Sequence, residues 1–258
     1  MNPSQVAIAL SLGLFGGLLA CVEVGYRIGR REAEPHPELA QEGIGVIEAA
    51  VFGLLGLLLA FSFAGGTSRL DARRQLIVQE ANAIGTAYLR LDELPIDHQP
   101  EMRLLFRKYL DSRIGAYEKL PDLEAVEREL GHSAQIQQEI WTQAVIASRA
   151  DGTQNTARLL LPALNEMIDV STSRTIALQT HLPRLIFHLL ICVALLSGLL
   201  AGYAMAKRKS RSWLHMLLFA AIIAITTYTI LDLDDPQSGW IRLKSAEKSL
   251  VQLRDSTR

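Results

Sequence analysis

The sequence predicts an all-α fold in which four transmembrane helices accompany a helical bundle domain inserted between the second and third spans. Three observations indicate this fold class. Hydrophobic residues make up 49% of 258 residues and charged residues 21%, yet the mean hydropathy is +0.19, so the two kinds are segregated along the chain. Four apolar segments are each long enough to cross a hydrocarbon core of roughly 30 Å. Between the second and third, apolar residues recur with helical spacing, and no stretch sustains the two-residue period of a strand.

The four apolar segments are predicted to be membrane spans at residues 6–22, 44–64, 185–206 and 213–231. The first of them could be mistaken for a secretory signal, but Met1–Gln5 contains no Lys or Arg and the basic residues follow the apolar run. We therefore expect it to be retained. The spans divide the chain into a first transmembrane hairpin (1–64), a helical extramembrane domain (65–183), a second transmembrane hairpin (184–231) and a C-terminal tail (232–258).

The distribution of Lys and Arg predicts how a multi-pass protein would lie in the cell (inner) membrane, because short cytoplasmic loops collect basic residues. The two short loops contain seven, against three near the end of the fourth span and none in the N-terminal tail. The seven are Arg27, Arg30, Arg31, Lys207, Arg208, Lys209 and Arg211, and the three are Arg242, Lys244 and Lys248. Charge counting therefore places the short loops in the cytoplasm and the helical domain outside. Arg69, Arg73 and Arg74, directly after the second span, favour the opposite orientation.

The segment between the second and third spans is predicted to be helical throughout. Its first stretch has one apolar face formed by Leu70, Ile77, Ala81, Ile84, Tyr88 and Leu91. Their three- and four-residue spacing, or its multiples, is typical of an amphipathic helix, and we expect it to continue the second span as one long helix. Further amphipathic stretches follow at 101–119, 123–130, 133–148 and 155–181. Pro162 is expected to kink or to start the last of them.

Composition and motifs argue against several functional classes. A net charge of −1 leaves no basic excess for nucleic acid. Cys21 and Cys192 lie in apolar runs, which is typical of inert thiols and not of a disulfide or zinc site. The six histidines offer no pair at helical metal-site spacing, and the chain has no P-loop, dinucleotide or nucleophile-elbow motif. We expect neither an enzyme nor a bound cofactor or metal.

Glu48 is the most demanding residue of the second span, because a carboxylate inside a bilayer is costly. It either reaches back to the interface or is held protonated, or it belongs to an ion or proton path. The same span carries small residues at Gly45, Ala49, Gly53, Gly56 and Ala60. Such a face lets helices approach closely, and in an oligomer it could equally surround an axis.

Phe61 and Phe63 follow at the end of the second span, where aromatic rings either face lipid or core, or form a hydrophobic constriction. At roughly 100° per residue, Glu48 lies about 60° from Phe63 and about 140° from Phe61. We therefore expect Phe63, and not Phe61, to share a face with Glu48 and to form the constriction if there is a pore.

Polar residues continue beyond the second span. Arg69, Arg73 and Arg74 are expected at the membrane exit, where they can meet lipid headgroups or pair between subunits. They are followed by Glu80, Asn82, Gly85, Thr86, Arg90 and Asp92. We expect Glu80 to pair with a basic residue of a neighbouring helix and Gly85 to permit close approach of another backbone. This polar helix either assembles the bundle or lines a vestibule beyond the membrane.

Asp232, Asp234 and Asp235 cluster where the fourth span ends. They are either solvated interfacial charges or an entrance that attracts cations.

The stretch from Phe61 to Pro95, with the core Glu80–Thr86, resembles the signature of the bestrophin-like domain, a bacterial membrane family. The order of parts is similar over nearly the whole chain, including the acidic run Leu231–Pro236, Gly239 and Ile241–Arg242. The resemblance implies a multi-pass bacterial protein and, more remotely, the architecture of bestrophins, which are oligomeric anion channels with the second span lining the pore and the helical domain in the cytoplasm. The family often has a basic residue where Asp235 stands, so the resemblance assigns that position no role.

Two classes of function follow. The first is an oligomeric ion channel in which copies of the second span surround an axis, so that the partners are the bilayer, further copies of the chain and inorganic ions. The second is a non-conducting membrane sensor or scaffold whose helical domain binds a partner. Two features distinguish these classes: the symmetry of the oligomer, and the presence of a continuous polar path along the second spans.

Overall fold

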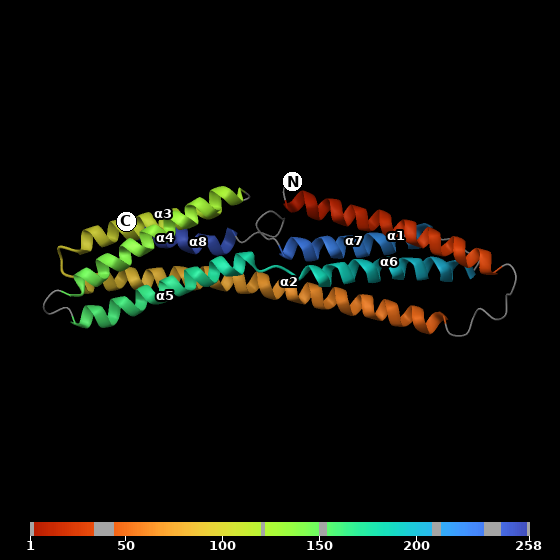
Figure 1. Ribbon diagram of the computed structural model, residues 1–258, viewed down its shortest axis with the longest axis horizontal. Coiled ribbons are helices and arrows are strands. Elements are labelled where there is room, and N and C mark those ends of the chain that lie inside the picture. Colours follow the sequence, from red (N-terminus) through yellow and green to blue (C-terminus); the bar gives the residue numbers. More distant parts are fainter. Residues whose placement is uncertain are drawn as a thin grey trace. The chain divides into compact units, whose positions relative to one another are not determined.

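The computed structural model describes residues 3–33, 44–119, 122–149, 154–207, 213–234 and 244–256. This described part is helical and contains no strand, in agreement with the predicted all-α class. Its elements are α1 (Pro3–Ala33), α2 (Ile44–Leu89), the 3-10 helix η1 (Arg90–Glu93), α3 (Gln99–Glu118), α4 (Leu123–Ala147), α5 (Gln154–Gln179), α6 (Arg184–Lys207), α7 (Trp213–Asp234) and α8 (Lys244–Ser256) (Figure 1).

Four helical stretches of the described chain are long and apolar enough to cross a membrane, which confirms the predicted number of spans. They are Ser4–Arg31, Gly45–Glu93, Asn155–Ala206, which includes residues of both α5 and α6, and Trp213–Asp234. The helices that contain the first two spans run well past the apolar segments. In particular, α2 continues without a break from the second span into the polar signature, as the shared periodicity predicts.

The chain divides into two compact units. Unit 1 comprises Met1–Ser68 and His181–Trp240, and unit 2 comprises Arg69–Thr180 and Ile241–Arg258. Helix α2 therefore begins in unit 1 and ends in unit 2. Unit 1 contains α1, α6 and α7, and unit 2 contains α3, α4, α5 and α8.

The close packing of α1 against α6 organises unit 1 (Figure 1). A Cβ at Gly25 would lie 1.9 Å from the carbonyl oxygen of Leu199, and one at Gly202 would lie 1.9 Å from that of Val22. Only glycine lets the two backbones meet at these points. The apolar core beside this contact includes Leu14, Leu18, Leu55, Leu190 and Ala220.

Unit 2 has its own apolar core around α3. Phe106, Tyr109 and Leu110 are fully buried there, and they pack with residues of four other helices, Ile84, Ile140, Leu164, Met167 and Leu250. Leu250 belongs to α8, which lies within the predicted C-terminal tail. The sequence analysis did not anticipate this helix.

Local signals explain several helix ends in unit 2. Asp122 caps α4 by accepting a hydrogen bond from the backbone N–H of Ala125 (3.1 Å). The stretches expected at 123–130 and 133–148 form this one helix, because exposed Gly131 interrupts the periodicity without ending the helix. Pro162 lies inside α5 instead of starting it, and one turn earlier the carbonyl of Leu159 accepts a hydrogen bond from Arg90 Nη1 (2.5 Å).

Candidate functional site

The part of α2 in unit 1 packs with one face only. Leu55 and Ser62 are 2% and 3% exposed, Phe52 meets Phe219 of α7 edge to face at a centroid distance of 5.7 Å, and a Cβ at Gly66 would contact Leu233 at 3.2 Å. These residues recur at helical spacing on one side of α2. They form the face by which α2 joins unit 1.

A second face of α2 consists of small residues and is open. We call it the small-residue face, and it comprises Gly45, Ala49, Gly53, Gly56, Ala60 and Ala64, all of them exposed. A Cβ added at Gly53 or Gly56 would meet no described atom within 4 Å. The contrast with Gly25 and Gly202 is sharp, because those glycines are needed for contacts inside the chain and these are not.

Phe61 and Phe63 lie on different sides of α2, with exposed fractions of 66% and 43%. At about 100° per residue, Phe63 lies about 20° from Gly56, next to the small-residue face. Phe61 lies about 140° from Gly56 and about 20° from exposed Leu54, among bulky apolar side chains. The structure therefore gives the two rings different surroundings.

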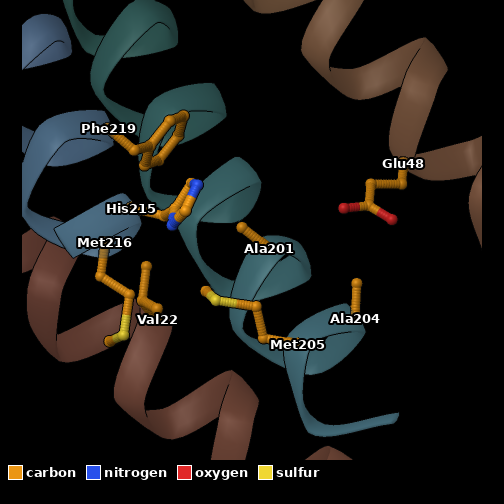
Figure 2. A pocket seen from close by; sticks show the side chains of 8 residues that line it. All are labelled: Val22, Glu48, Ala201, Ala204, Met205, His215, Met216 and Phe219. Carbon is orange, nitrogen blue, oxygen red and sulfur yellow. The ribbon is translucent and has the colours of Figure 1, made fainter. Parts of the chain in front are cut away.

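Glu48 lies in a pocket of about 340 Å³ that is lined by residues of α1, α6, α7 and the part of α2 in unit 1. Figure 2 shows its carboxylate extending from α2 toward α6, where Ala201, Ala204 and Met205 lie. His215, Met216 and Phe219 of α7 and Val22 of α1 complete the lining. Glu48 lies about 20° from Leu55 on the helix, so it belongs to the packed side. The structure does not place it on the small-residue face.

In unit 2, Glu80 is fully buried at 0% exposure between two arginines. Its Oε1 accepts a hydrogen bond from Arg113 Nε at 2.6 Å and lies 2.5 Å from Nη2 of the same arginine, and its Oε2 accepts a hydrogen bond from Arg174 Nη1. Arg113 and Arg174 are 3% and 2% exposed. We call Glu80, Arg113, Arg174, Tyr109 and Tyr117 the arginine cluster, because the two tyrosines surround the guanidinium groups.

Electrostatics within the arginine cluster follow from its burial. Burial alone would lower the pKa of Arg113, but the carboxylate of Glu80 outweighs this effect and raises it. Burial also raises the pKa of the Tyr109 phenol to about 12. The Tyr117 ring lies 3.7 Å from Cζ of Arg174, a cation–π contact.

The sequence analysis expected a basic partner for Glu80 but identified neither arginine. The available signal was the spacing of Tyr109, Arg113 and Tyr117, four residues apart on α3, which places a charge on an otherwise apolar face. Arg174 stands at such a position on α5, three and seven residues after buried Ser171 and Met167. A charged residue on the helix face that otherwise carries buried residues indicates an ion pair inside the core.

The three arginines at the expected membrane exit have different surroundings. Arg73 is 4% exposed, and it donates hydrogen bonds from Nε to Ala177 O (3.0 Å) and from Nη2 to Thr180 O (2.8 Å). It thus caps the carboxyl end of α5, where cations are favoured, and does not face lipid. Arg74 pairs with exposed Asp71 at 3.4 Å, and Arg69 is half-buried.

The remaining signature residues line a shallow pocket or pair at the surface. Asn82 and Thr86 are exposed and line a pocket of about 350 Å³ together with Gln79, Ala83, Arg90, Pro162, Ala163 and Glu166. Asp92 forms a surface ion pair with Arg103. A Cβ at Gly85 would lie 3.4 Å from the side chain of Leu253, an ordinary contact, so Gly85 is not required there by a neighbouring backbone.

The acidic cluster at the end of α7 is engaged within unit 1. Asp232 is 5% exposed. Asp234 accepts a hydrogen bond from the Leu182 backbone N–H at 3.0 Å and lies 3.6 Å from His181 Nδ1, just before α6 begins. Asp235 lies outside the described residues. Within the described chain, no group of three His, Cys, Asp or Glu side chains could hold a metal ion.

Comparisons with known proteins identify a family and a fold. Residues 16–247 match the family described as Bestrophin-like domain. A mutant bestrophin homologue from Klebsiella pneumoniae superposes with a TM-score of 0.65 at 16% identity, covering 92% of this chain and 99% of that one. A second mutant of that homologue gives 0.63 at 15% identity, covering 95% and 98%.

A further crystal structure, described as a membrane protein mutant, gives a TM-score of 0.63 at 16% identity and covers 94% of this chain and 98% of that one. At such identities these likenesses show the fold alone. A comparison with curated protein sequences gave no match.

Proposed function

The chain belongs to the bestrophin-like domain family and is a membrane protein with the bestrophin fold; from this premise we propose that it is an oligomeric ion channel of the bacterial inner membrane. In this proposal the α2 helices of several copies surround the pore. The observation that supports it most directly is the open small-residue face of α2.

Small residues within a span are favourable where another helix or an axis comes close, because they let the backbones approach each other closely. Gly25 and Gly202 serve that purpose inside the chain. Gly53 and Gly56 have no described neighbour that needs them. We propose that copies of the chain bring their small-residue faces toward a common axis.

Phe63 borders the small-residue face and is proposed to form the constriction, since a ring of apolar side chains resists wetting. Phe61 lies among bulky apolar residues and is proposed to face lipid. Glu48 is proposed to contribute its carboxyl group to the ion path from within its pocket. In unit 2, the exposed Gln75, Gln79, Asn82 and Thr86 of α2 are polar, and we assign them to a vestibule beyond the membrane.

Single-channel recording of the purified protein in planar bilayers tests the proposal, after its stoichiometry has been measured. We expect Phe63→Ala to raise conductance, because a smaller side chain widens a dewetted constriction. Phe61→Ala is the matched control, two residues away on the same helix, and should conduct like the wild type. If none of these proteins conducts although each is folded and oligomeric, the channel proposal is wrong.

The alternative is a non-conducting sensor or scaffold, and the shallow pocket lined by Asn82, Thr86 and Glu166 favours it. This pocket presents polar side chains to solvent on unit 2, as a docking surface for a partner would. The two proposals differ in their response to Asn82→Leu. A scaffold should lose its partner while the oligomer is unchanged, whereas a channel should keep its assembly and change its conductance.

A further inference from the structure

The arginine cluster of unit 2 carries more positive than negative charge. Among the described residues, Glu80 is the carboxylate that pairs with both Arg113 and Arg174, and all three side chains are at most 3% exposed. One carboxylate neutralises one guanidinium, so a single positive charge is left over. Such a charge is costly away from water unless something compensates it.

The tyrosines do not supply the missing charge. Burial keeps Tyr109 protonated, because its pKa is raised to about 12. The Tyr117 ring lies over the face of Arg174, and a neutral ring offers a partial charge only. The excess positive charge of the cluster therefore remains at neutral pH.

The hydrogen-bonding pattern indicates where a compensating group would bind. Arg113 directs its Nε and Nη2 at Glu80, whereas Arg174 contacts the same carboxylate through Nη1 only. Nε and Nη2 of Arg174 are buried and have no hydrogen-bond partner among the described residues. These two N–H groups form one edge of the guanidinium, the fork that binds anions in a bidentate manner.

A further donor lies in the same cluster. The hydroxyl of Tyr109 is buried and makes no hydrogen bond of normal geometry within the described chain, although the Ser171 hydroxyl is near enough to act on its pKa as a hydrogen-bond partner. The Tyr109 hydroxyl lies close enough to Glu80, Arg113 and Ser171 for all three to influence its pKa, and Ser171 is one turn before Arg174 on α5. Buried donors of this kind are normally satisfied.

We propose that the Nε–Nη2 edge of Arg174, together with the Tyr109 hydroxyl, binds a small monovalent anion such as chloride or nitrate inside unit 2. The class of ligand follows from the cluster. One uncompensated charge calls for one negative charge, each of the three groups carries an N–H or O–H that can donate to an anion, and the buried position excludes a large ion. This site is independent of whether the chain conducts.

The test is the thermal unfolding of the full-length protein in detergent with sodium chloride, nitrate or gluconate at constant ionic strength. A ligand that binds the folded state raises the melting temperature in a saturable manner. We expect chloride and nitrate to raise it by several degrees relative to gluconate, which is too large to enter. Arg174→Met should abolish this difference.

Arg103→Met is the matched control. Arg103 also lies over a tyrosine ring, 5.0 Å from the centroid of Tyr88, and pairs with a carboxylate, but at the surface. This variant should keep the anion effect, and Tyr109→Phe should raise the half-saturating chloride concentration several-fold. If the half-saturating chloride concentration of Tyr109→Phe equals that of the wild type, the Tyr109 hydroxyl does not bind the anion.

Crystals of the wild type grown in bromide provide a readout that does not depend on any variant folding. We expect an anomalous peak at the Nε–Nη2 edge of Arg174. The proposal is overturned if that peak is absent, if the melting temperature does not depend on the anion, or if Arg174→Met keeps the full chloride effect.

Discussion

Glu80 illustrates how much a residue's role depends on burial. Its side chain is fully buried and bridges two helices through Arg113 and Arg174, whereas Asp92, twelve residues later, forms a surface pair with Arg103. Both are acidic residues of the same signature. Their energetic consequences should nevertheless differ, because water screens the surface pair and does not reach the buried one.

We predict that Glu80→Leu destabilises the protein by about 3–5 kcal/mol, since removing one partner of a buried ion pair leaves uncompensated charge. Asp92→Asn should cost roughly 0–1 kcal/mol, as is usual for a surface pair. Chemical unfolding of both variants beside the wild type measures the difference. Equal destabilisation would mean that the arginine cluster does not hold unit 2 together.

Tyr109 gives unit 2 a dependence on alkaline pH. Its pKa is raised to about 12 by burial, against about 10 for a free tyrosine. Above pH 10 the unfolded chain loses this proton while the folded one keeps it, so stability is complete below pH 10 and is lost as pH rises toward 12. We predict that Tyr109→Phe reduces the slope of unfolding free energy between pH 9.5 and 11.5. A slope identical to that of the wild type would contradict this.

At the scale of the element, α1 and α2 use glycine for different purposes. In α1, Gly25 is required because the backbone of α6 occupies the space that a Cβ would need. In α2, a Cβ at Gly53 or Gly56 would meet no atom of the described residues within 4 Å. Both helices carry glycines within apolar sequence, so only their neighbours distinguish an internal packing surface from one available to other copies.

We predict that Gly25→Ala disrupts unit 1, because its Cβ would lie 1.9 Å from the carbonyl oxygen of Leu199 and 2.9 Å from its carbonyl carbon. Gly13→Ala in the same helix is the control, since a Cβ there meets nothing within 4 Å and alanine is the better helix former by about 1 kcal/mol. Melting temperature and yield of folded protein report the outcome. A Gly25→Ala protein as stable as Gly13→Ala would show that α1 and α6 can separate at little cost.

At the scale of the whole molecule, the open question is which side of the membrane holds unit 2. The short loops between the spans contain seven Lys and Arg, against three near the end of the fourth span, which favours unit 2 outside. The orientation implied by the bestrophin resemblance is the reverse. Arg73 gives no information about the orientation through a contact with lipid headgroups, because its side chain caps α5.

Charge counting predicts that a reporter fluorescent only in the cytoplasm is dark when fused at Arg258 and bright when inserted near Lys209. Long translocated domains contribute little to this count, so the short loops should decide the topology. Insertion of the same reporter into a cytosolic protein controls for folding of the reporter. The opposite pattern would place unit 2 in the cytoplasm.

The sequence by itself determined the all-α class, the four spans and the continuation of the second span into the polar signature. Hydropathy and helical periodicity are local properties, and they can be read from residues a few positions apart. The polar character of Glu80, Asn82 and Thr86 could also be read from the sequence. It led to the prediction that this stretch makes specific contacts.

Only the tertiary structure decided which side chains meet. The partners of Glu80 lie 33 and 94 residues away along the chain, Arg73 serves the end of a different helix, and Glu48 joins the packed side of α2 while Phe63 borders its open face. The physical reason is that burial and pairing depend on which helix faces pack together. Periodicity shows that a helix has faces, but the neighbours of each face are set by contacts distant in the sequence.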